Sequence, residues 1–355
     1  MSRRDRAREI AGGYPLVAAD PATVTWLTGL AADIEWGPNA FSTAPIAVVD
    51  PDGGVILVTS EDEAPGAADG VEVRPYPGFA VEDVDRPAAA YALVMDALGD
   101  ATSVAAELHA IPGSIAVGLV SRAAVVRDVA AELRAARAVK DADELEAIRA
   151  AVAVADTGQA AARTAFRAGQ TELDVWRDVH GAMEAAAGGR VPVLADIVSG
   201  ERTAEVGGPP SGRTAGETDL LLADLVPRIG GYWADSCATI ALGEPAAEAR
   251  AAHARAVETL ERAVEAIRPG VTAGEIDDLC RTAMGGYPHH TGHGIGTSWH
   301  EQPRIIPGSG RRLEPGMVIA LEPGTYGDGW GVRVERVVAV TESGCDVLSG
   351  HSLEL

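Results

Sequence analysis

Residues 220–240, LLLADLVPRIGGYWADSCATI, and residues 316–340, GMVIALEPGTYGDGWGVRVERVVAV, share one layout. Each begins with an apolar run that ends in a carboxylate and continues through a turn rich in glycine and aromatic residues. A second carboxylate then enters another strand. The two pairs are Asp224 with Asp235, and Glu322 with Glu335. The layout predicts two similar hairpins, each of which folds its two carboxylates to one end.

The apolar runs are typical of strands that are buried on both faces. A carboxylate that closes such a run faces a large desolvation cost unless a positive charge compensates it. One such pair is more simply interpreted as an exposed strand end. Two similar pairs in one chain predict a bound cation, or several.

The segment between the two pairs is rich in histidine. Four of the eight histidines lie in residues 289–303, HHTGHGIGTSWHEQP, namely His289, His290, His293 and His300. Imidazole is a common ligand of divalent transition metals. The interspersed glycines allow the backbone to approach a ligand closely. This cluster therefore adds nitrogen ligands to the predicted cation site.

Four carboxylates and one imidazole form a hard, oxygen-rich donor set. This set suits Mn²⁺ best, and it also accepts Co²⁺, Zn²⁺ or Fe²⁺. So much negative charge indicates two ions about 3.5–4 Å apart, with bridging carboxylates for which Asp235 and Glu335 are the candidates. Such a pair of ions lowers the pKa of a bridging water and polarises a carbonyl oxygen. The chemistry expected from the residues is metal-dependent hydrolysis.

The remaining sequence predicts an α/β (α+β) protein of two domains, because 355 residues exceed one typical core. A charged stretch at 133–146 precedes a long helix that begins at Asp141 or Asp143, so we expect domains at 1–135 and 136–355. Further helices are expected at about 246–267 and from Thr272, which has capping-box spacing with Glu275. The expected N-terminal strands are 15–19, 45–49, 54–59, 71–76 and 103–107.

Composition limits the partners of this protein. The formal net charge of -23 and the sequence pI of about 4.7 disfavour nucleic acid and anionic membranes as partners. No run of about 18 apolar residues is present to span a membrane, and the basic N-terminus lacks the apolar stretch of a secretory signal. The cysteines, Cys237, Cys280 and Cys345, are far apart. This spacing favours neither disulfides nor thiolate metal sites and fits a cytoplasmic location.

At these residues the chain resembles the M24 "pita-bread" metallopeptidases, which include aminopeptidase P, prolidase and creatinase. The resemblance rests on the two aspartates and on HxTGHGIG, HExP, LEPG and GVRVE in order, together with DPATVTWLTG at 20–29. It implies a creatinase-type N-terminal α/β domain, a pseudo-symmetric pita-bread catalytic domain and a homodimer. It further implies release of the N-terminal residue from Xaa-Pro dipeptides or peptides through a metal-bridging hydroxide.

The resemblance also assigns roles to residues of this chain. It implies that Asp224, Asp235, His293, Glu322 and Glu335 bind two metal ions. It implies that His289 and His300 bind substrate or stabilise the tetrahedral intermediate, and that Glu322 also takes a proton from the attacking water. Arg333 corresponds to an arginine that neighbours the last glutamate and orients it.

Four departures from the family pattern keep other functions open. Residues 206–212, VGGPPSG, carry no histidine, so Gly207 or Gly208 takes the place of a substrate-binding imidazole. Val226, Ala238 and Arg336 replace a usual glycine, arginine and aspartate. The first alternative is a metal-dependent hydrolase of a non-peptide C–N bond, acting on creatine-like substrates or modified amino acids. The second is a non-catalytic binding homologue, which the retention of the full donor set disfavours.

Overall fold

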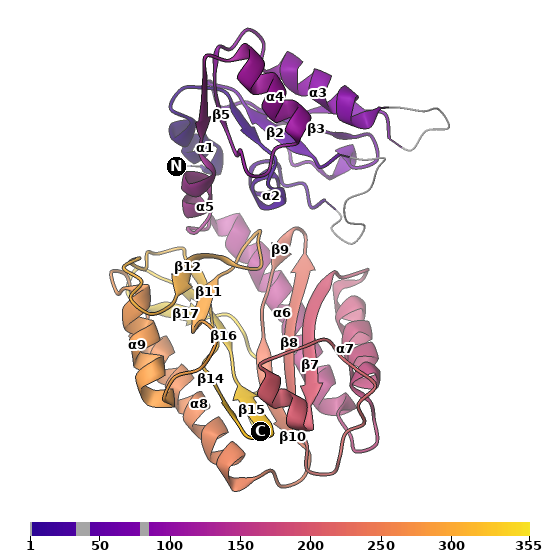
Figure 1. Cartoon of the computed structure of the whole chain (residues 1–355), viewed down its shortest axis with the longest axis vertical. Coiled ribbons are helices and arrows are strands. Elements are labelled where there is room, and N and C mark those ends of the chain that lie inside the picture. The colour runs from indigo at the N-terminus through magenta and orange to yellow at the C-terminus, as the bar shows by residue number, and fades with distance from the viewer. Residues whose placement is uncertain (1, 33–42, 79–84) are drawn as a thin grey trace. The chain divides into compact units, whose positions relative to one another are not determined.

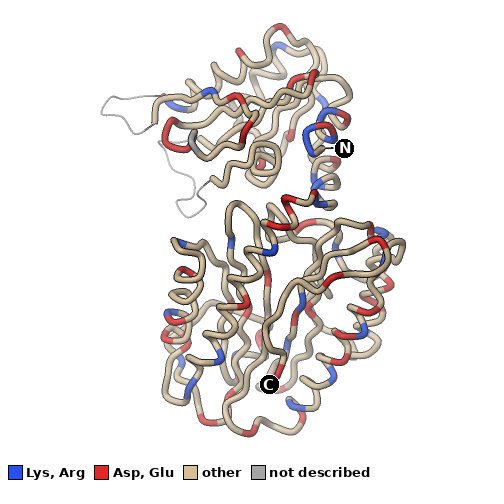
Figure 2. The backbone as a smooth tube through the Cα atoms, turned by 180° about the vertical axis from the view of Figure 1, so that it is seen from behind, with Lys and Arg blue, Asp and Glu red and all other residues tan. Residues whose placement is uncertain are grey.

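The computed structural model describes residues 2–32, 43–78 and 85–355. The described chain divides into two compact units, residues 1–137 and 138–355. Each unit has its own sheets and its own hydrophobic clusters. Acidic residues are distributed over the backbone of both units (Figure 2). Within the described ranges, no helix is long and apolar enough to cross a membrane.

The first unit is built around a mixed sheet with the strand order β4-β3-β2-β1-β5-β6 (Figure 1). Antiparallel pairing joins β1 to β2 and β2 to β3, whereas β3–β4, β1–β5 and β5–β6 are parallel. The expected strands therefore form, with ends within one residue of those predicted. The elements are α1 (Arg3–Ala11), β1 (Leu16–Ala18), α2 (Pro21–Thr28), β2 (Ile46–Val49), β3 (Val55–Ser60), β4 (Val71–Tyr76), α3 (Arg86–Ala97), β5 (Ser103–Ala106), α4 (Gly113–Arg122), β6 (Val125–Asp128) and α5 (Ala130–Ala136).

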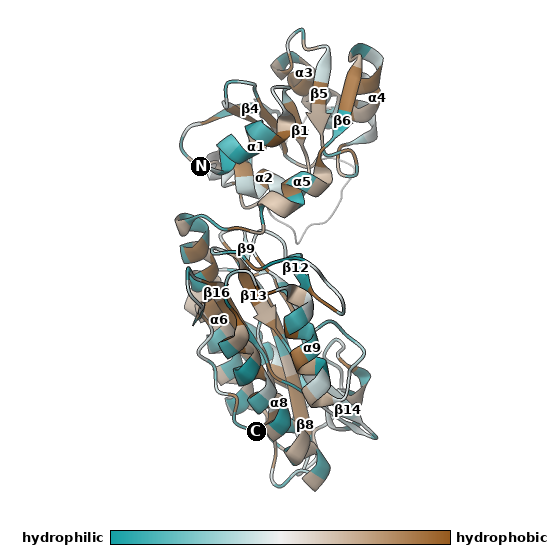
Figure 3. Cartoon of the chain, turned by 90° about the vertical axis from the view of Figure 1, so that its left-hand side faces the viewer, coloured by the Kyte–Doolittle hydropathy of each residue, from teal (hydrophilic) through white to brown (hydrophobic). Residues whose placement is uncertain are grey.

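The second unit repeats one arrangement, a helix pair against an antiparallel sheet. The pair α6 and α7 packs on the sheet β10-β8-β7, and α8 and α9 pack on the sheet β12-β11-β13-β16-β17. The hydropathy colours of Figure 3 follow this layout, with brown strands β8 and β13 and hydrophilic segments on α8. The first half comprises α6 (Ala142–Ala165), α7 (Glu172–Ala187), β7 (Val193–Ser199), η2 (Gly200–Glu205), β8 (Leu220–Ile229), β9 (Tyr232–Trp233) and β10 (Cys237–Ala241). The second half comprises α8 (Ala247–Ala266), α9 (Ala273–Met284), β11 (Gly292–Gly294), β12 (Glu301–Ile305), β13 (Val318–Leu321), β14 (Gly324–Gly327), β15 (Trp330–Arg333), β16 (Arg336–Val340) and β17 (Cys345–Val347).

Local sequence signals explain where the long helices begin and end. Asp141 caps α6 and forms a capping box with Glu144, and Thr272 does the same for α9 with Glu275. The helix α8 ends at Ala266, just before the Pro-Gly pair that sequence marks as a stop. These three predicted helices are confirmed to within about a residue at the ends that caps or breakers define.

The strand pattern departs from the sequence prediction at Asp224. We expected this carboxylate to close its apolar run, but β8 continues through it to Ile229, so that Asp224 lies in mid-strand. The strand continues because its last residues pair with β9. In mid-strand, Asp224 lies opposite Cys237 of β10 and Asp196 of β7. Glu322, by contrast, does follow the end of β13 as predicted.

Candidate metal centre

Three of the predicted carboxylates converge from different strands. Asp224 is carried by β8, Asp235 lies two residues before β10, and Glu335 immediately precedes β16. One carboxylate oxygen from each of the three lies within 4.8 Å of the other two. The backbone N–H of Glu335 donates to the carbonyl of Cys237 at 3.0 Å and so joins the second half of this unit to the first. The cluster therefore depends on both halves of the predicted repeat.

His293 lies on β11, which pairs with β12 on one side and with β13 on the other, and its side chain faces the same cluster. Its Nε2 lies 3.4 Å from Asp235 Oδ2 and 3.7 Å from Glu322 Oε1. Its Nδ1 lies 3.0 Å from the carbonyl oxygen of Gly294, which can only accept. Nδ1 is therefore the protonated nitrogen of the neutral ring, and Nε2 presents a lone pair to two carboxylates. Burial lowers the pKa of His293, which favours this neutral form.

The glycines that flank His293 have a different use from the one expected. A Cβ on Gly292 would lie 2.1 Å from the carbonyl oxygen of Ala320, and one on Gly294 would lie 2.1 Å from that of Gln302. These glycines allow three strand backbones to pack closely around His293. The sequence prediction of a close backbone approach holds, but the approach is to neighbouring strands.

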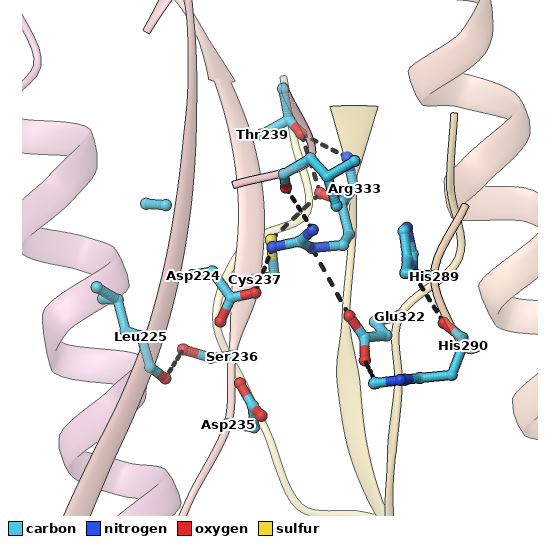
Figure 4. A network of polar contacts seen from close by, with 12 residues as sticks. Asp224, Leu225, Asp235, Ser236, Cys237, Thr239, His289, His290, Glu322 and Arg333 are labelled. Carbon is cyan, nitrogen blue, oxygen red and sulfur yellow. Dashed lines mark hydrogen bonds and ion pairs between the residues drawn. The ribbon is translucent and has the colours of Figure 1, made fainter. Parts of the chain in front are cut away.

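Glu322 and Arg333 are joined in the network drawn in Figure 4. Arg333 is buried, and its Nη2 donates to Asp224 Oδ2 at 2.5 Å while its Nε lies 3.7 Å from Glu322 Oε2. Its Nη1 donates to the carbonyl of Val206 at 2.6 Å. The hydrogen bond goes to Asp224, whereas the family resemblance implies that this arginine orients Glu335. Arg333 holds two predicted ligands and one loop in fixed relation.

His290, which sequence analysis placed in the histidine cluster without a role of its own, contacts Glu322 directly. Arg304 can only donate, so its Nη2 at 3.0 Å from His290 Nδ1 makes that nitrogen an acceptor. His290 Nε2 then carries the proton and donates to Glu322 Oε1 at 2.8 Å. Burial acts to raise the pKa of Glu322, but this hydrogen bond and the charge of Arg333 outweigh it and lower the pKa to about 2. Glu322 is therefore ionised at neutral pH.

For the other carboxylates of the cluster, the charge of Arg333 does not offset the cost of burial. Burial, and then the charge of Glu322, raises the pKa of Asp235 to about 8. Burial also raises the pKa of Asp224 and of Glu335 well above the ordinary range. Among described residues, Asp235 Oδ1 and Glu335 Oε1 are buried without a hydrogen-bond partner. These orphaned oxygens and the lone pair of His293 are the environment that divalent cations satisfy, so the residues present fit a dinuclear centre.

The two predicted substrate-binding histidines, His289 and His300, differ in whether their ring nitrogens are already hydrogen-bonded. His289 Nδ1 donates to the carbonyl of His290 at 2.7 Å, and its Nε2 accepts from the hydroxyl of Tyr326 at 2.9 Å. His300 makes no hydrogen bond with the described part of the chain. Its ring lies 4.0 Å from that of His293 and stacks on Trp299 at 4.2 Å. His300 is thus the imidazole of the pair that is free to contact a substrate.

A buried ion pair supports the loop that carries His300. Lys140 Nζ lies 2.9 Å from Glu301 Oε2, and both side chains are 1% exposed. The other oxygen of Glu301 accepts from the backbone N–H of Ser298 at 3.1 Å and from the hydroxyl of Thr297. Removing one partner from such a pair leaves an uncompensated buried charge, which is strongly destabilising. The loop before His300 is therefore fixed by a residue at the start of the second unit.

These groups open into a cavity of about 230 Å³. This volume lies just below the range of about 300–1,000 Å³ typical of small-molecule sites, so the site suits a short ligand. Sequence analysis identified neither β7 nor the wall that this strand supplies. The lining residues are Leu194, Ala195, Asp196, Asp224, Val226, Asp235, His289, His290, His293, Trp299, His300, Glu322 and Arg333.

Comparison with known proteins agrees with this geometry. The model of metallopeptidase family M24 matches residues 146–342 of the chain. The chain is 35% identical over 263 residues to the probable dipeptidase PepE of Mycobacterium tuberculosis, covering 72% of this chain and 70% of that protein. It is 34% identical over 226 residues to the Xaa-Pro dipeptidase of Pyrococcus furiosus, covering 62% of this chain and 65% of that protein.

A solved structure extends the likeness to the whole fold. The prolidase of Pyrococcus horikoshii matches with a TM-score of 0.84 at 24% identity, covering 99% of each chain. The chain therefore belongs to metallopeptidase family M24 and has the pita-bread fold of its peptidases. The family resemblance and the fold class expected from the sequence are confirmed.

The cluster makes a prediction about metal-linked stability. Because four buried carboxylates repel one another, Mn²⁺ should raise the melting temperature of the chelator-treated protein. A ligand that binds only the folded state contributes about 4 kcal/mol at a thousandfold excess over its Kd. Asp235→Ala and Glu335→Ala should each abolish this shift and the bound metal, measured by differential scanning fluorimetry and by elemental analysis.

The matched control for these variants is Asp328→Ala, which removes an exposed carboxylate between β14 and β15. This control should keep both the metal and the thermal shift. Two equivalents of metal in the Asp235→Ala or Glu335→Ala protein would contradict the assignment of the cage.

Proposed function

We propose that this metallopeptidase releases the N-terminal residue from Xaa-Pro dipeptides or short peptides. The observation that carries the proposal is the set of orphaned carboxylate oxygens and the unprotonated His293 Nε2, which converge beside a small cavity. The size of the cavity favours a dipeptide or the end of a short chain. The Xaa-Pro specificity is supported by the relative named Xaa-Pro dipeptidase and by the fold shared with a prolidase.

The proposed metal ligands are Asp224, Asp235, His293, Glu322 and Glu335, which would hold two divalent cations, most suitably Mn²⁺. When bound, the cations would supply an acidified water and polarise the scissile carbonyl. We propose that Asp235 and Glu335 would serve both cations, because one buried oxygen of each carboxylate has no hydrogen-bond partner among the described residues.

The proton and the developing charge are assigned to side chains of this chain. Glu322 is ionised and lies at the cavity, so we assign it the proton of the attacking water. His300 has free ring nitrogens and would donate to the oxygen of the tetrahedral intermediate. His289, engaged with Tyr326, would act on substrate only by giving up a hydrogen bond. Arg333 keeps Asp224 and Glu322 in place.

A second candidate is hydrolysis of a different C–N bond by the same cage. It is favoured by the segment 206–208, where Gly207 and Gly208 leave no imidazole on the substrate side. The native metal, the homodimer, the cytoplasmic location and the assignment of residues 1–135 as a creatinase-type domain stay predictions.

The proposed activity predicts metal-dependent release of the first residue from Xaa-Pro peptides. A panel of Xaa-Pro dipeptides and longer Xaa-Pro peptides should be turned over with Mn²⁺, and a chelator should abolish the reaction. Amino-acid release by chromatography measures both. A protein that retains two metals and cleaves no member of the panel would favour the second candidate, and other amides would then be screened.

Replacement of His300 tests its role separately from metal binding. His300→Ala should lower kcat by about 10²–10³-fold, the cost of removing one oxyanion donor, with near-normal metal content. His109→Ala, which removes a partly exposed histidine of the first unit, is the control. Loss of metal from the His300→Ala protein would instead show that His300 is a ligand.

A further inference from the structure

Asp196 is a cavity-lining carboxylate outside the predicted cage. It lies on β7 directly opposite Asp224 of β8, so the two side chains project from the same face of the sheet. No described residue donates a hydrogen bond to Asp196 or forms an ion pair with it. A partly buried carboxylate without a cationic partner, open to a ligand cavity, is available to a positively charged group of the ligand.

The loop at 206–208 leaves room for this carboxylate. A Cβ on Gly207 would lie 1.9 Å from Asp196 Oδ2, so a side chain there would collide with it. The loop is tied on both sides, because Arg333 donates to the carbonyl of Val206 at 2.6 Å and Ile197 N–H donates to that of Gly208 at 3.1 Å. The family resemblance predicts a substrate-binding imidazole at this loop. The cavity presents the carboxylate of Asp196 there instead.

Facing residues of β7 and β8 form one wall of the cavity, and each facing pair makes one rung of the ladder. The rung of Asp196 with Asp224 lies at the cage, and the next rung on the same face of the sheet, two residues along, pairs Leu194 with Val226. Both rungs line the cavity. Leu194 is 43% exposed, as is Trp299 at the same cavity, and exposed large hydrophobic residues in a cavity indicate ligand contact. The wall thus changes from acidic beside the cage to apolar at the next rung on the same face.

This order matches the two groups on the α-carbon of an N-terminal residue. The α-ammonium is separated from the scissile carbonyl by a single carbon, so it must lie near the cage. The side chain extends away from the same carbon. Two divalent cations and Arg333 would engage the four carboxylates of the cage. No described residue donates a hydrogen bond to Asp196, so this carboxylate stays available to a cationic group of the ligand.

Resting on the proposed peptidase function, we propose that Asp196 determines substrate specificity by pairing with the α-ammonium of the substrate. The rung of Leu194 with Val226 receives an apolar first side chain. The substrate class is therefore a short peptide with a free amino terminus and an aliphatic first residue. Asp196 is not a metal ligand in this assignment.

The test compares ligands that differ only in the amine. Leu-Pro and 4-methylpentanoyl-Pro form the substrate pair, and L-leucine and 4-methylpentanoate form the product pair. For the Mn²⁺-loaded protein, kcat/KM is measured for the first pair and Kd by calorimetry for the second. The wild type should prefer the amine by about ten- to a hundredfold, the range for a hydrogen bond between charged groups. Asp196→Asn should lose most of this preference in both measurements and keep two metals.

Asp328→Asn provides the same loss of charge at an exposed position and should behave as wild type. A retained amine preference in Asp196→Asn, an absent preference in the wild type, or loss of metal in Asp196→Asn would each overturn the inference. A preference for Lys-Pro over Leu-Pro that disappears in Asp196→Asn would place a side-chain ammonium there instead. The product pair decides the role of Asp196 even if no Xaa-Pro peptide is cleaved, so failure of the proposed function remains distinguishable.

Discussion

Desolvation of neighbouring carboxylates, together with their mutual repulsion, is the constraint on which the second unit depends. Asp224, Asp235 and Glu335 lie together in an environment that raises the pKa of each, whereas Glu322 is kept ionised by His290 and Arg333. Such an arrangement costs folding free energy unless cations or protons compensate it. A fold that keeps these carboxylates together needs stabilising contacts elsewhere. In this unit, two helix-covered sheets with their hydrophobic clusters supply those contacts.

The two halves of this unit are joined at the cage itself. The N–H of Glu335 donates to Cys237 O, and the hydroxyl of Thr239 donates to the carbonyl of Arg333 at 2.9 Å. These bonds fix the strand that follows Asp235 in one half against the segment that carries Arg333 and Glu335 in the other. Arg333 adds a charged contact from the second half to Asp224 of the first. Contacts at the candidate site thus join the two halves, in addition to the hydrophobic cluster that packs Ile148 and Val152 against Val318 and Val337.

Sequence signals predicted the features that are local in the chain. Caps at Asp141 and Thr272 defined helix starts, and hydrophobic runs defined the strands of the first unit, since these signals act within a few residues. The carboxylate pairs and the histidine cluster stood out as candidates because they form an uncommon pattern, whereas the choice of His293 rests on the family resemblance. Asp196 and the contact of His290 with Glu322 were not predictable, because cross-strand register and ring orientation depend on tertiary packing. The mid-strand position of Asp224 was missed for the same reason.

The position of the ring proton distinguishes the neighbouring histidines of the candidate site from one another. His290, His293 and His300 bring ring nitrogens within 4.8 Å of one another, and distance alone would treat them as equivalent ligands. Arg304 forces the proton of His290 onto Nε2, where Glu322 accepts it, while Gly294 forces that of His293 onto Nδ1. Only His293 therefore has a lone pair directed at carboxylates, and His300 keeps both nitrogens free of the described chain. Hydrogen-bond partners outside the candidate cage thus distinguish the imidazole proposed as a metal ligand from the one proposed to contact a substrate.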